Sequence, residues 1–223
     1  MATHYDLEEQ EQIAQLKHFW SRYGNTITWV LIAVLGAYAA WNGWQYWQRK
    51  TALEAAVLFD ELERAAQGTD VEKLNRVWAD MQQKAGKTAQ AHHAALITAK
   101  ALQDAGKADE AHAALKWLVE QTSDAALQSV ARLRLAGLEL QSGKPDEALR
   151  WIGTGMAAEF QALADDRRGD ILSTQGKSDD ARDAYRKAWD ALPATQDYRR
   201  IVEAKLNALG VDPGAAANRE TRP

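Results

Sequence analysis

Histidine is the side chain in this sequence that could most readily hold a metal ion or act as a general base. His92 and His93 are adjacent, so on a helix they would point about 100° apart and could not readily grip one ion. Neither the H-E-x-x-H nor the H-x-x-E-H spacing of zinc enzymes occurs. Surface or partly packed positions are therefore expected for all five histidines: His4, His18, His92, His93 and His112.

Paired carboxylates are the second possible source of chemistry. Three pairs are expected to cap helix starts at repeat turns rather than form a catalytic set: Asp109-Glu110, Asp165-Asp166 and Asp179-Asp180. A glycine-rich phosphate loop and a G-x-S-x-G nucleophile turn are both missing from the sequence. The sequence therefore predicts no enzyme, no catalytic residue, no metal and no cofactor. The enzymatic alternative is a membrane-bound hydrolase that uses His92 or His112.

Composition narrows the function classes further. The 223 residues include no cysteine, which removes disulfides, thiol catalysis and iron–sulfur clusters together. The net charge is −4 and no long block of one sign occurs, so nucleic acid is not an expected partner. Abundant alanine and only four prolines favour packed helices. An all-α protein is predicted.

A stretch of 25 residues without a charged side chain, residues 24–48, is typical of a transmembrane helix. A bilayer core about 30 Å thick needs about 20 apolar residues in a helix. Trp29 lies near one end of the stretch, and aromatic rings suited to the membrane interface gather at the other: Trp41, Trp44, Tyr46 and Trp47. The lipid bilayer is thus the first predicted partner.

Two alternatives to a membrane span are a cleaved signal peptide, for which Ala37-Tyr38-Ala39 offers a site, and a buried core helix. The acidic start and the length of the apolar run argue against cleavage. Basic residues are balanced on the two sides of the span, so charge does not determine its orientation.

Small residues predict a face for packing against another membrane helix: Gly36, Ala40 and Gly43. Ahead of the span, the spacing of Ile13, Leu16, Trp20 and Tyr23 predicts an amphipathic helix.

One short phrase, G-K-x-D-[DE]-A, occurs three times after the span, and its glycines are 37 and 33 residues apart. This period is typical of helical-hairpin repeats. Glycine can turn through positive φ, the acids suit the first turn of the next helix, and alanine allows close helix contact. The predicted turn residues are Gly106, Ala111, Gly143, Ala148, Gly176 and Ala181.

These repeats resemble the tetratricopeptide repeat, with Gly169, Gly176, Tyr185 and Pro193 matching in the last unit. Arg132, Glu139, Asp165 and Arg168 depart from that pattern, so a generic α-hairpin array stays open as the alternative. The resemblance implies a tetratricopeptide-like solenoid with a concave binding face. The candidate residues on that face are His93, Leu96, Lys100, Gln103, Val130, Leu133, Leu140, Leu163, Asp166 and Asp170. Trp78, Trp117, Trp151 and Trp189 are expected in the core.

The membrane-proximal motifs are more specific. The acidic lead from Tyr5 to Gln12, the Leu16–Trp20 segment and the exit motif Gly43–Gln48 resemble the YfgM-type ancillary subunits of the bacterial SecYEG translocon. The resemblance implies a single-pass inner-membrane protein with a cytoplasmic N-terminus and a periplasmic helical domain. Together with the sequence patterns, it gives four expected segments: a cytoplasmic tail (1–23), a transmembrane helix (24–48), a periplasmic repeat domain (49–209) and a disordered tail (210–223), the last expected because its residues show no periodicity. It also implies three partners, which are SecYEG, the membrane-anchored chaperone PpiD and newly exported polypeptides.

Partner identity is left open by the residues themselves. A general periplasmic holdase chaperone and an envelope-stress regulatory adaptor, neither attached to the translocon, are the alternatives to a translocon scaffold. Client specificity and oligomeric state are likewise not determined by the sequence.

Overall fold

The structure is a computed structural model that describes residues 7–68 and 70–214, with side chains from residue 11 onward. The described residues form helices and contain no strand, so the all-α prediction is confirmed. The chain divides into two compact units between Leu53 and Glu54. The first helix, α1 (Leu7–Ala66), contributes to both units. The predicted segments at residues 1–6 and 215–223 lie outside the described residues.

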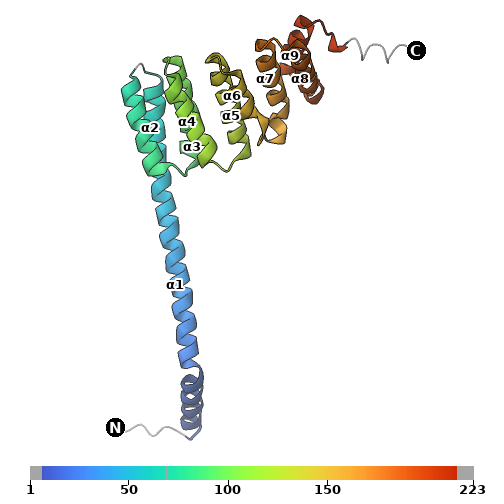
Figure 1. Cartoon of the computed structure of the whole chain (residues 1–223). Helices are drawn as coiled ribbons and strands as arrows, with labels where there is room; N and C mark the ends of the chain where they lie inside the picture. Colours follow the sequence, from blue (N-terminus) through green and yellow to red (C-terminus); the bar gives the residue numbers. More distant parts are fainter. Residues whose placement is uncertain (1–6, 69, 215–223) are drawn as a thin grey trace, which may run out of the picture. The chain divides into compact units, whose positions relative to one another are not determined.

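The second unit is an array of helical hairpins that follow one another in chain order (Figure 1). The end of α1 and α2 (Val71–Ala85) share the first hydrophobic core with the helices that follow them. Three hairpins come next, and a single helix closes the array. Their bounds are α3 (Ala89–Asp104) with α4 (Ala108–Gln121), α5 (Ala125–Gln141) with α6 (Pro145–Gly153), α7 (Gln161–Thr174) with α8 (Ser178–Ala191), and α9 (Tyr198–Ala208).

The repeated phrase forms the same turn in all three hairpins. Gly106, Gly143 and Gly176 have φ of +74°, +71° and +74°, a region that L side chains rarely adopt. The lysine after each glycine donates its N–H to a carbonyl five residues earlier, for example Lys107 to Leu102 at 2.8 Å. This is the Schellman motif, which satisfies the last carbonyls of the first helix. The alanine that ends each phrase is fully buried.

Three hydrophobic cores run along the array. The first joins the end of α1 to α2, α3, α4 and α5, the second joins α5, α6 and α7, and the third joins α7, α8 and α9. Trp78 is buried in the first core, and Trp117, Trp151 and Trp189 pack against the cores with part of their surface exposed. The interpretation of the four tryptophans as core residues is therefore confirmed.

Two further glycines, Gly68 and Gly210, follow helices of the array. Gly68 follows α1 without a positive φ, so the first turn is not a copy of the other three. At the other end, Gly210 has φ +78° and Val211 donates its N–H to Leu206 O at 3.0 Å, which closes α9. Val211 also packs against the third core and Pro213 is buried, so ordered packing passes the boundary predicted at residue 210.

Candidate functional site

A groove of about 390 Å³ lies across the first helices of the first three helix pairs. The end of α1, α3 and α5 contribute its walls. Leu96 and Lys100, two of the predicted face residues, line it. Seven further residues complete it: Glu63, Ala66, Gln67, Ile97, Ala101, Asp104 and Arg134. We call this the inner groove.

The inner groove combines an apolar floor with charges of both signs. Lys100 pairs with Asp104 one turn later, and both side chains are well exposed. Arg134 of α5 donates from Nη1 to the Leu96 carbonyl of α3 at 3.0 Å. Beside them Gln103 donates to Gln141 Oε1 at 3.0 Å, a second link between these helices. Because its two acidic side chains, Glu63 and Asp104, balance the two basic ones, Lys100 and Arg134, the groove suits a partner without strong net charge.

The remaining residues of the predicted face do not all join the groove. His93 is exposed on α3. Val130, Leu133 and Leu140 are half-buried on α5, and the two leucines pack against the second core. Leu163 is half-buried on α7.

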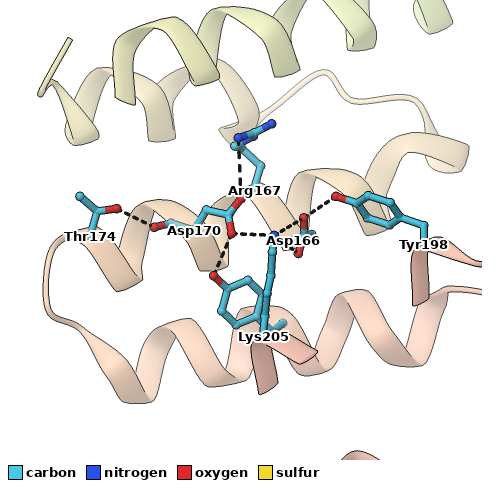
Figure 2. Close-up of polar contacts among 7 residues, drawn as sticks. Asp166, Arg167, Asp170, Thr174, Tyr198 and Lys205 are labelled. Carbon is cyan, nitrogen blue, oxygen red and sulfur yellow. Dashed lines mark hydrogen bonds and ion pairs between the residues drawn. The ribbon is translucent and has the colours of Figure 1, made fainter. Parts of the chain in front are cut away.

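Asp166 and Asp170 lie in a different environment from the one expected, because α9 covers them (Figure 2). Lys205 Nζ lies 2.8 Å from Asp166 Oδ1 and 2.7 Å from Asp170 Oδ1. Tyr198 donates its hydroxyl to Asp166 at 2.6 Å, and Tyr185 donates to Asp170 at 2.9 Å. Asp166 is only 2% exposed. Asp166 is therefore closed to a partner, whereas the Asp170 side chain keeps 25% of its surface exposed while it links α7 to α8 and α9.

The same cluster fixes the protonation of its tyrosines. Burial, and then hydrogen bonding to the neighbouring carboxylates, raises the pKa of Tyr185 and Tyr198. Both hydroxyls consequently remain protonated donors at alkaline pH values at which an exposed tyrosine would ionise.

The paired acids fall into two groups. Asp109-Glu110 and Asp179-Asp180 occupy the first turns of α4 and α8, as expected. Asp165-Asp166 lies one turn inside α7, so the capping interpretation of that pair is wrong. A short 3-10 helix, η1 (Ala158–Phe160), leads directly into α7, and this places the helix start before the acids.

Residues that break the repeat pattern find polar partners inside the array, Glu139 in neighbouring elements and Arg168 within its own helix α7. Glu139, only 9% exposed, lies 2.9 Å from His112 Nε2, and Lys144 Nζ lies 3.8 Å away. Arg168 donates to Asp165 at 2.7 Å. These polar positions are accounted for by internal pairing rather than by a catalytic arrangement.

The histidines that the structure describes do not assemble into a metal site. In residues 7–68 and 70–214, no group of three or more His, Asp or Glu side chains is placed to hold an ion. His4 lies outside the described residues. His92 packs beside Trp117, with a ring-centroid distance of 6.1 Å, and the described chain offers its buried Nε2 no hydrogen-bond partner.

Acid should destabilise the array through His92. Burial, followed by the neighbouring His93, lowers the pKa of His92 below its ordinary value of about 6.5. When the pH falls below about 6.5, His92 becomes protonated in the unfolded chain but stays neutral in the folded chain. The free energy of unfolding therefore decreases as the pH is lowered. We expect His92→Gln to show a smaller loss of melting temperature between pH 7 and pH 5. His18→Gln, at an exposed position outside the array, is the control, and an equal loss in wild type and His92→Gln would contradict this assignment.

The apolar segment of α1 is open to its surroundings along its length. Only 6% of its most apolar 18-residue window is buried, so the core-helix alternative is wrong. A Cβ built at Gly36 or Gly43 meets no atom within 4 Å, which leaves the small-residue face free. Asn42 donates to the Tyr38 carbonyl at 3.0 Å and so satisfies its amide within the helix. By length and composition this helix can cross a membrane.

Comparison with known proteins gives consistent matches. A family model described as a tetratricopeptide repeat-like domain matches residues 17–211. Relatives over nearly the whole length of the chain carry the name ancillary SecYEG translocon subunit. The Neisseria gonorrhoeae protein is 30% identical over 94% of this chain and 100% of its own length. The Haemophilus influenzae protein is 29% identical over 92% of this chain and 99% of its own length. The Escherichia coli protein is 25% identical over 91% of this chain and 97% of its own length.

Proposed function

The chain belongs to the tetratricopeptide repeat-like family of ancillary SecYEG translocon subunits, and from this membership we propose that it is an inner-membrane scaffold attached to the translocon. The observation that carries the proposal is the combination, in one chain, of an exposed apolar helix with a hairpin array that keeps an open groove. The helix provides attachment and the array provides contact with proteins. The role is adhesion, without a reaction of its own.

In the proposed topology, the N-terminus is cytoplasmic and the array is periplasmic. A chaperone of the PpiD type and newly exported polypeptides are the partners proposed for the inner groove, together with the adjoining face residues His93, Gln103 and Val130. Anchoring raises the effective concentration of the array at the membrane, so modest contacts suffice. The balanced charges of the groove, two of each sign, favour neutral and apolar chain segments.

Packing of the span against a membrane partner is the step most open to test. Replacing Gly36, Ala40 and Gly43 together with leucine adds bulk on the small-residue face, while leucine keeps the segment suited to the bilayer. We expect recovery of SecYEG with the tagged full chain to fall about tenfold, the change that about 1.4 kcal/mol of lost packing produces. The measurement is affinity purification from native membranes solubilised in mild detergent.

The control places leucine on the opposite face, at Val34 and Tyr38, where side chains are already large. Recovery of SecYEG with that variant should match wild type. Undiminished recovery with the triple variant would remove this face from the interface. If translocon components are missing even from wild-type purifications, the holdase alternative takes the place of the scaffold.

A further inference from the structure

The part of α1 that precedes the span exposes a row of large apolar side chains. Ile13, Leu16, Trp20 and Tyr23 are between 42% and 67% exposed, and we call them the apolar stripe. Phe19 borders the stripe, and its ring centroid lies 5.1 Å from that of Tyr23. Such a concentration of exposed apolar surface on one helix indicates a surface that meets another apolar phase.

The opposite side of this helical segment is polar. At about 100° per residue, Ile13, Leu16 and Trp20 fall within one arc of the helix. Gln15, His18 and Arg22 fall within the opposite arc, and we call them the polar stripe. An apolar face with aromatic and leucine side chains, opposed by a face with basic residues, is the pattern of helices that lie in a membrane interface.

Continuity with the span identifies what covers the apolar stripe. The helix passes from Tyr23 into the uncharged stretch at Gly24 without leaving the helical conformation. Residues 11–23 are about 20 Å long as a helix. If they left the bilayer along the axis of the span, the stripe would face water over that distance. Trp and Tyr rings favour the headgroup layer, and Lys17 and Arg22 can reach lipid phosphates from it.

We propose that residues 11–23 lie along the membrane–water interface, with the apolar stripe toward the lipid acyl chains and the polar stripe toward water. The partner is the phospholipid bilayer itself. This goes beyond the translocon role, because it requires no protein contact.

The junction between stripe and span has the features of a bend. Thr28 Oγ1 donates to the Gly24 carbonyl at 2.8 Å, a bond back to the fourth preceding residue that often bends helices. The Trp20 ring lies against Gly24, where an added Cβ would come within 3.1 Å of the indole Nε1. Glycine at this position thus leaves room for the ring to fold over the turn that leads into the bilayer.

The absence of cysteine from the sequence makes a direct test possible. Single-cysteine variants of the full chain carry a nitroxide label at Leu16→Cys or Trp20→Cys on the apolar stripe, and at Gln15→Cys or His18→Cys on the polar stripe. The protein is reconstituted in vesicles of phosphatidylcholine and phosphatidylglycerol. We expect the ratio of collision with oxygen to collision with a water-soluble nickel chelate to be about fivefold higher on the apolar stripe.

Two positions calibrate the scale, Ala33→Cys in the span and Ala113→Cys at an exposed site on α4. Equal ratios on both stripes, near the Ala113→Cys value, would overturn the proposal, because they would place the segment in water. Such a result would leave a protein partner as the cover of the stripe. Circular dichroism shows which variants keep their helix content. Resistance to carbonate extraction shows which variants are inserted in the membrane.

Discussion

Replacing Lys205 with methionine is expected to lower the free energy of unfolding of the helical array by about 3 kcal/mol. The ammonium is shared by Asp166 and Asp170, and Asp166 is almost wholly buried. Without it, a buried carboxylate keeps only the Tyr198 hydroxyl as a partner among these side chains. The change should appear as a lower midpoint of urea unfolding, followed by circular dichroism on the full chain in detergent.

Two control variants test whether the loss of stability in Lys205→Met comes from the buried ion pair. Lys100→Met removes an ammonium whose pair with Asp104 is exposed, so its effect should stay below about 0.5 kcal/mol. The double variant Asp166→Leu/Lys205→Met removes both charges and should regain most of the loss. If Lys205→Met proved no more harmful than Lys100→Met, the cluster would not be the element that fixes α9.

Gly169→Ala is expected to destabilise the array by about 3 kcal/mol through overpacking. A Cβ at this position would lie 2.4 Å from Cδ1 and Cε1 of Tyr185, far inside contact distance. The ring cannot move aside easily, because it is buried in the third core and its hydroxyl is bonded to Asp170. Thermal unfolding of the full chain measures the effect.

Gly137→Ala is the matched control, since it also replaces a helical glycine of the array. No atom lies within 4 Å of a Cβ built there, so alanine should leave stability unchanged or raise it by about 0.5–1 kcal/mol. Similar melting temperatures for the two variants would show that α7 and α8 are not in close contact at Gly169.

The turns were predictable because the interactions that make them lie within a few residues. In each phrase the glycine supplies a left-handed conformation, and the next N–H bonds a carbonyl of the preceding helix. Interactions between residues this close in the chain can be predicted from a short sequence motif. The same argument fails at Gly68, where the phrase is missing and the turn is different, so the contributions of Glu63 and Gln67 to the inner groove were not foreseen.

The polar pairs were not predictable from periodicity, because their members are far apart in the chain. Asp166 and Lys205 are 39 residues apart, and Asp166 and Tyr198 are 32 apart. The helical pattern put Asp166 on the inner face, yet only the packing of α9 decides that this part of the face is closed. Glu139 broke the repeat pattern for the same reason, since its partner His112 belongs to another hairpin.

The division of the array into three cores limits how far local unfolding caused by a substitution can spread along it. The groove-forming helices share the first core, whereas Gly169 and Lys205 act on the third. Contacts in an array reach only adjacent elements, so melting can begin at one end without crossing the whole solenoid. Cooperativity is therefore regional. Lesions near the C-terminus loosen a local foldon, while the inner groove, whose helices share the first core, keeps its shape.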